Sequence, residues 1–145
     1  MIAYSVKQII NRPISEVFPH VADPLLHSAW MDVSNVEIRT PGDVRPGTVV
    51  HSDMKMRSRH VPFTWEVTEL EPNARVAFHT TQAPMDWDGS FDLTSEGDAT
   101  TRITASGQIR LRGWQRLLEP LMSGEVRRGE AAELARLKEL LEGPG

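Results

Sequence analysis

The sequence contains no cysteine, and this absence removes several classes of chemistry at once. Disulfide bonds, thiolate nucleophiles and thiolate metal sites are all excluded. No apolar run reaches the ~18 residues that a membrane-spanning helix needs, and no secretory apolar leader opens the chain. We therefore expect a cytoplasmic protein with no integral membrane segment.

The sequence also lacks an excess of charge of one sign. Its 145 residues include 16 Lys and Arg against 20 Asp and Glu, which gives a formal net charge of -4, and no basic block stands out. A nucleic-acid surface needs clustered Lys and Arg to neutralise phosphates, so no nucleic-acid partner is expected. The length and the hydrophobic content of 39% indicate one globular domain over residues 1–145. The sequence does not determine its oligomeric state.

Period-two alternation and turn residues predict seven strands. They cover residues 1–10, 33–40, 48–56, 61–70, 74–81, 85–93 and 100–111. After the first strand, Pro13 and the pair Asp23-Pro24 open two short helices, and Pro19 shortens or bends the first. The last six strands follow one another through short connections, which favours an antiparallel meander.

The last third of the chain is predicted as a long helix in two pieces. One apolar stripe is formed by Trp114, Leu117, Leu118 and Leu121, and a second by Val126, Leu134, Leu137 and Leu141. At about 100° per residue the two stripes do not share a face. A kink between residues 120 and 124, at the Pro and Gly positions, is expected to bring both stripes onto the sheet.

Strand parity predicts one apolar and one wet face for the sheet. Asp53, Glu66 and Asp88 belong to the wet face. In the stretch VPFTWEVTEL, residues 61–70, the large apolar side chains alternate up to Val67. Glu69 continues the same parity, so a carboxylate is expected at the end of an aromatic stripe.

The order of the elements and several stretches resemble the START-like, helix-grip superfamily, in particular its polyketide cyclase/dehydrase and lipid-transport (SRPBCC) branch. The matching stretches are INRPISEVFPHVADP with Trp30 after it, RPGTVVHSDMKM, FTWEVTELEPNARVAFHT, DGSFDLTSEGDATTRITASG and RLLEPLMSGEVRRGEAAELARLKELLE. The resemblance implies an α+β helix-grip fold, in which a curved seven-stranded antiparallel sheet wraps around the long C-terminal helix. It also implies a deep cavity between sheet and helix, entered near the two short helices.

On this resemblance we expect a ligand pocket, because one helix cannot fill the concave face. Flexible, polarisable methionines suit such a pocket. For the aromatic rings the alternative is a plain core, and for Trp30 it is a plug under the short helices. The expected lining residues are Trp30, Ser52, Met54, Met56, Phe63, Trp65, Phe78, Trp87, Phe91 and Met122.

The leading functional hypothesis is binding of a hydrophobic small molecule: a lipid, a quinone or an aromatic polyketide. One alternative is a polyketide cyclase or dehydratase that assists aldol closure and water loss. Another is a chaperone-cofactor or partner-binding domain, which would need an exposed apolar patch that the sequence does not show. No cofactor is expected. No metal is expected either, because His51 and Asp53 share a strand face without a third ligand.

Two residues are candidates for acid/base chemistry. His27 lies near the expected pocket mouth, and Glu69 lies where the resemblance implies an arginine in aromatic polyketide cyclases. A carboxylate cannot stabilise an enolate or oxyanion as a guanidinium does. Glu69 therefore weighs against cyclase chemistry and favours binding.

Overall fold

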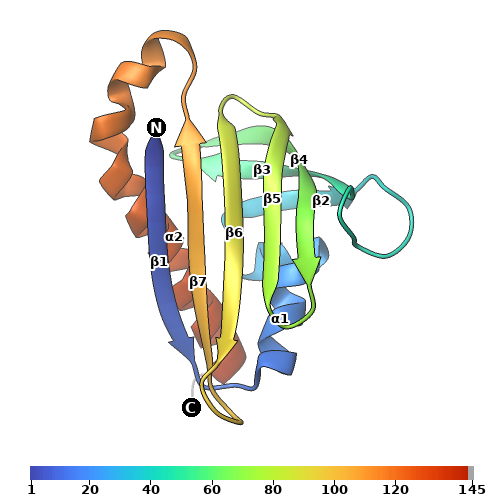
Figure 1. Ribbon diagram of the computed structural model, residues 1–145. Coiled ribbons are helices and arrows are strands. Elements are labelled where there is room, and N and C mark those ends of the chain that lie inside the picture. The colour runs from blue at the N-terminus through green and yellow to red at the C-terminus, as the bar shows by residue number, and fades with distance from the viewer. Residues whose placement is uncertain (144–145) are drawn as a thin grey trace.

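A curved antiparallel sheet wraps around one long helix, as expected for the helix-grip fold (Figure 1). The computed structural model describes residues 1–143, so the last two residues of the domain expected over residues 1–145 lie outside it. The seven strands are hydrogen-bonded in the order β1-β7-β6-β5-β4-β3-β2, and every neighbouring pair is antiparallel. The predicted fold class is confirmed.

The elements follow the predicted order with small changes at their ends. The strands are β1 (Ile2–Ile10), β2 (Val33–Ile38), β3 (Val49–Met56), β4 (Arg59–Glu71), β5 (Arg75–Gln82), β6 (Asp86–Ser95) and β7 (Thr101–Arg110). The helices are α1 (Ile14–Ala22), the short 3-10 helices η1 (Pro24–Ala29) and η2 (Gly113–Leu118), and α2 (Glu119–Glu142). The two predicted short helices are α1 and η1, and the side chain of Asp23 caps η1 by accepting from the backbone N–H of Leu25.

Two facing glycines let aromatic rings lie directly on the middle of the sheet. Gly89 of β6 pairs with Gly107 of β7. A Cβ at Gly89 would lie 2.4 Å from Cζ of Phe78, and one at Gly107 would lie 2.5 Å from the hydroxyl oxygen of Tyr4. Only a residue without a side chain allows this approach. The glycines therefore fix how deep the rings of Phe78 and Tyr4 sit.

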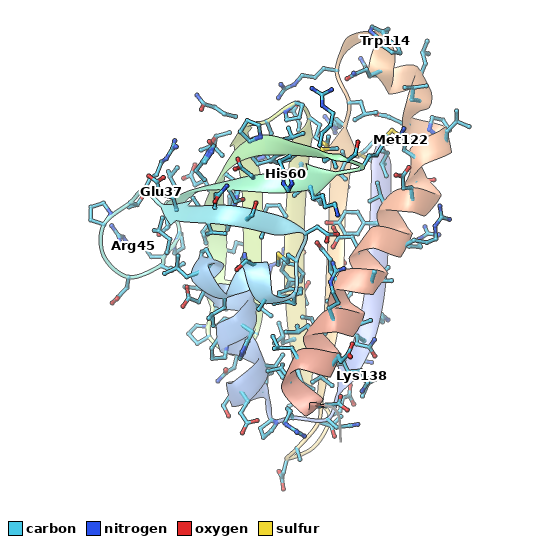
Figure 2. All side chains as sticks on the ribbon, turned by 180° about the vertical axis from the view of Figure 1, so that it is seen from behind. Glu37, Arg45, His60, Trp114, Met122 and Lys138 are labelled. Atoms are coloured by element: carbon cyan, nitrogen blue, oxygen red, sulfur yellow. The ribbon has the colours of Figure 1, made fainter. Side chains whose placement is uncertain are left out.

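The start of the C-terminal helix differs from the prediction. The break comes before residue 119 rather than in residues 120–124, and α2 then runs uninterrupted to Glu142. Pro120 lies in the first turn, where its missing N–H leaves no intrahelical hydrogen bond unmade. The expectation that the first stripe packs on the sheet is therefore wrong. Trp114, Leu117 and Leu121 are 71%, 81% and 80% exposed, and Trp114 projects from one end of the molecule (Figure 2).

The second stripe of α2 does pack on the sheet. Leu134 and Leu137 are fully buried and join the core around Ile2, Ile10 and Ile103. No helix within residues 1–143 has both the length and the apolar character that a membrane crossing requires.

Candidate functional site

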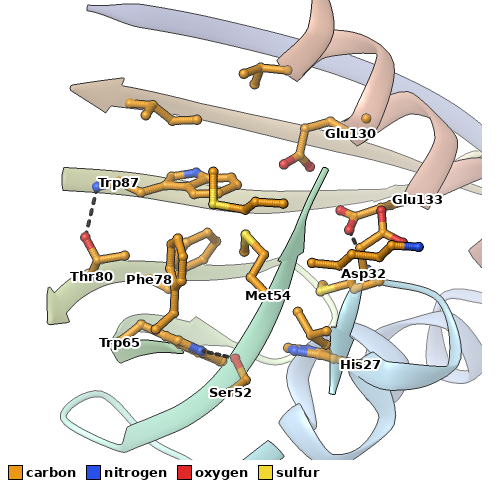
Figure 3. A pocket seen from close by; sticks show the side chains of 18 of the residues that line it. His27, Asp32, Ser52, Met54, Trp65, Phe78, Thr80, Trp87, Glu130 and Glu133 are labelled. Carbon is orange, nitrogen blue, oxygen red and sulfur yellow. Dashed lines mark hydrogen bonds between the residues drawn. The ribbon is translucent and has the colours of Figure 1, made fainter. Parts of the chain in front are cut away.

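A cavity of about 350 Å³ lies between the concave face of the sheet and α2 (Figure 3). This volume falls at the lower end of the ~300–1,000 Å³ typical of small-molecule sites. Strands β3, β4, β5 and β6, the short helix η1 and the middle of α2 all contribute side chains to the wall. The cavity exists because the single helix covers only part of a strongly curved sheet.

Aromatic rings form one continuous wall of the cavity. Neighbouring ring centroids are 5.7 Å apart for Trp65 and Phe78, 6.1 Å for Phe78 and Trp87, and 6.4 Å for Phe63 and Trp87. These separations are typical of favourable edge-to-face and tilted contacts. The rings support one another and present an apolar surface of ring faces and edges to the cavity.

Nine of the ten residues predicted to bind ligand are placed on the cavity wall. They are Ser52, Met54, Met56, Phe63, Trp65, Phe78, Trp87, Phe91 and Met122.

Trp30 is the exception among the ten. It is only 1% exposed, its indole N–H donates to the backbone oxygen of His20 at 3.1 Å, and its ring packs against Phe91. The cavity wall does not include it. Trp30 is therefore a buried plug beneath the short helices, which is the alternative that the sequence left open for it.

Glu69 lies outside the cavity, although the alternation of the sequence puts it on the apolar parity. The register of β4 against β5 shifts between Val67, which pairs with Phe78, and Glu69, which pairs with Ala77. This bulge absorbs one residue and inverts the parity of the strand beyond it. Glu69 consequently points to the outer face, where its carboxylate accepts from Nε of Arg75 at 2.7 Å. No role in the cavity follows for it.

His27 lines the cavity and is 7% exposed, so it is a buried wall residue. Its Nε2 lies 2.8 Å from the backbone oxygen of Val21. A carbonyl only accepts, so this nitrogen carries the proton. Burial lowers the pKa of His27, which keeps the ring neutral, and the ring stacks on Trp65. The arrangement makes His27 a fixed wall residue whose Nε2–H is already used.

The indole N–H groups of the cavity are also engaged. The indole N–H of Trp87 donates to the hydroxyl of Tyr4 at 3.0 Å, and that of Trp65 reaches the hydroxyl of Ser52 at 3.4 Å. The hydroxyl of Thr80 accepts from the backbone N–H of Trp87. Burial raises the pKa of Tyr4, so its hydroxyl stays protonated.

Two glutamates on α2 are cavity residues that the sequence prediction missed. Glu130 is 7% exposed and Glu133 is half-buried, and both project from the helix into the cavity (Figure 3). Burial, and then the charge of Glu133, raise the pKa of Glu130 to about 8. Burial likewise raises the pKa of Glu133 to about 7. Their positions three residues apart, within the stripe of Val126 and Leu137, could have revealed them.

A polar clamp joins the segment after η1 to α2 at the rim. The backbone N–H of Asp32 donates to Glu133 at 2.9 Å. Arg136 pairs with the carboxylate of Asp32 at 3.2 Å and donates to the backbone oxygen of Trp30 at 2.9 Å. These contacts tie the short helices to the middle of the long one. Across residues 1–143, His, Asp and Glu side chains form no group of three that could hold a metal ion.

Comparison with known proteins adds a family and a set of similar folds. The family described as polyketide cyclase / dehydrase and lipid transport matches residues 1–142. No curated protein matches the sequence.

Several solved structures share the fold. TTHA0849 from Thermus thermophilus is 18% identical with a TM-score of 0.80, over 99% of both chains. The Zhui aromatase/cyclase from Streptomyces sp. R1128 is 17% identical with a TM-score of 0.79, over 97% of this chain and 93% of that one. The di-domain ARO/CYC BexL from the BE-7585A biosynthetic pathway is 20% identical with a TM-score of 0.80, over 98% of this chain and 47% of that one.

Proposed function

Because the chain belongs to the polyketide cyclase / dehydrase and lipid transport family, we propose that it binds an apolar, aromatic small molecule in the cavity between sheet and α2. The ligand-binding roles of the nine predicted lining residues are part of this proposal. The observation that carries it is the continuous aromatic wall, because rings that face open space gain by covering it with apolar surface.

The wall also limits the kind of ligand. The rings of Trp65, Phe78 and Trp87 are inclined to one another by 63° and 55°, so they offer both faces and edges to an aromatic ligand. Met54 and Met122 can adjust to its outline. A cavity of about 350 Å³ suits a compact ring system better than a long acyl chain. We therefore favour an aromatic ligand over a lipid within the classes expected from the sequence.

The test is calorimetric titration with 1-naphthylmethanol, a neutral two-ring probe. We expect Trp65→Ala and Phe78→Ala each to weaken binding about tenfold, because each removes an aromatic contact. The matched control is Trp114→Ala, which removes the same side chain type from an exposed site outside the cavity. Circular dichroism verifies that each variant is folded.

The control variant should bind like the original protein. No measurable binding by the original protein, or equal losses in Trp65→Ala and Trp114→Ala, would contradict the proposal.

Ring closure and water loss on a polyketide is a second candidate function, and one observation favours it. Glu130 faces the cavity with a raised pKa, so it can carry a transferable proton near neutral pH. The test is incubation with a synthetic poly-β-ketone thioester and mass spectrometry of the products. Cyclised product that forms with the original protein but not with Glu130→Gln supports catalysis. The same products from both proteins would exclude Glu130 as the proton donor.

A further inference from the structure

Hydrogen-bond donors are scarce in the cavity. The ring N–H groups of His27, Trp65 and Trp87 all point to protein acceptors, as described above. Among the interior groups within residues 1–143, the hydroxyl hydrogens of Ser52 and Tyr4 and the carboxyl proton of Glu130, while it is bound, remain for a ligand. A ligand carboxylate therefore finds no cation in the interior, because the cationic lining residues that the structure describes, Lys55 and Arg57, are exposed at the rim.

Acidic groups are in excess. The charged lining residues are Asp32, Glu125, Glu130 and Glu133 against Lys55 and Arg57. Arg57 lies in the turn between β3 and β4 and already pairs with Glu125 at 3.8 Å, across the rim of the cavity. The formal charge of the wall is therefore negative.

Glu130 is the buried member of this set, and it lacks a partner. Within residues 1–143 its carboxyl group makes no hydrogen bond and no salt bridge. Its side chain points from α2 toward the aromatic wall, with Glu133 beside it (Figure 3). Its oxygens border the open space of the cavity, so a bound cation with N–H donors would pair with them in surroundings of low polarity.

We propose that Glu130, supported by Glu133, recognises a protonated amine, so that the ligand is an aromatic molecule carrying one basic nitrogen. This inference rests on the proposed binding function of the cavity. The ammonium group supplies both the charge and the donors that the site lacks, and the neighbouring ring faces attract the same cation. The aromatic body of the ligand lies against Trp87 and Phe78 while its nitrogen reaches α2.

Binding of an ammonium should release protons from the protein. The other titratable groups that line the same space are Tyr4 from β1, His27 from η1, Asp32 after η1, Lys55 and Arg57 from the hairpin of β3 and β4, and Glu125 and Glu133 from α2. Burial holds Glu130 partly protonated at pH 7, and a nearby cation favours the carboxylate. Binding of an amine therefore releases the proton of the Glu130 carboxyl group to the solvent.

Two probes that share one ring system test the inference. They are 1-naphthylmethylamine, which is positively charged at pH 7, and the neutral 1-naphthylmethanol. We expect the protein to bind the amine about tenfold more tightly than the alcohol, and Glu130→Gln to remove this preference while still binding the alcohol. Glu139→Gln, an exposed acid on the same helix outside the cavity, is the control and should keep the preference.

The outcomes separate this inference from the proposed function. If neither probe binds, the binding function itself fails. If the alcohol binds but the amine binds no more tightly, the cavity stands and amine recognition is overturned. Retention of the amine preference in Glu130→Gln also overturns the assignment. Titration of the amine in buffers of different ionisation enthalpy should show proton release at pH 7, and its absence would count against Glu130.

Discussion

Replacing Glu130 by glutamine should stabilise the protein, and the gain should grow with pH. Glutamine keeps the shape of the side chain but never ionises. In the original protein, burial raises the pKa of this carboxyl group from 4.5 to about 8, so the folded state holds the proton more tightly than the unfolded state does. The contribution of Glu130 to the free energy of unfolding therefore falls as pH rises between about 4.5 and about 8, and the variant lacks this contribution. Glu133, whose pKa burial raises to about 7, titrates in both proteins, so the prediction concerns the difference between them.

The size of the effect follows from the same shift. At about 1.4 kcal/mol per pH unit, ionisation at pH 9 costs at most about 5 kcal/mol. The carboxylate faces a cavity that water can enter, so the measured gain should be smaller, on the order of 1–2 kcal/mol.

Urea denaturation of both proteins at pH 5, 7 and 9 measures the difference in their free energies of unfolding, with Glu139→Gln as control. A difference between Glu130→Gln and the original protein that stays constant over this range, or that shrinks toward pH 9, would refute the reasoning.

Three further outcomes follow from the geometry. Gly89→Ala should destabilise the fold by about 1–3 kcal/mol in urea denaturation, because the new Cβ would lie 2.4 Å from the ring of Phe78; an unchanged midpoint would show that the ring moves freely. Gly129→Ala should raise the free energy of unfolding by up to about 1 kcal/mol, since a Cβ there meets no atom within 4 Å and alanine favours the helix. Glu69→Gln should change the affinity for 1-naphthylmethanol by less than about twofold, because Glu69 lies outside the cavity. It should lower the free energy of unfolding by less than about 1 kcal/mol, through loss of the exposed pair with Arg75. A change in affinity of about tenfold would show that Glu69 takes part in ligand binding.

The alternation of apolar and polar residues in the strands predicted most of the fold and most of the residues of the cavity wall. Period-two alternation in β3 to β6 depends only on the pleat, so it placed Trp65, Phe78 and Trp87 on the concave side. It failed at Glu69, because a bulge adds one residue to a strand without changing the local composition. Nothing in the stretch EVTEL marks that extra residue.

The carboxyl groups of the cavity were missed for a different reason. Glu130 and Glu133 interrupt the apolar stripe of Val126 and Leu137, and in most helices glutamates are exposed. Only the curvature of the sheet, which leaves a space beside α2, turns this face into a cavity wall. The exposed stripe of Trp114, Leu117 and Leu121 shows the converse, because helical spacing predicts an apolar face but not what it contacts.

The sheet order has a consequence for how the cavity comes into being. β1 lies at one edge and pairs with β7, so Ile2 meets Ile109, and the same strand packs against α2. Contacts between segments so distant in sequence carry a large loop-closure cost and form slowly. The pocket is thus assembled only when both ends of the chain have met, and a growing chain on the ribosome has no enclosed site until α2 has emerged. A ligand that needs the closed cavity therefore selects finished molecules, and its presence should raise their resistance to unfolding in proportion to how tightly it binds.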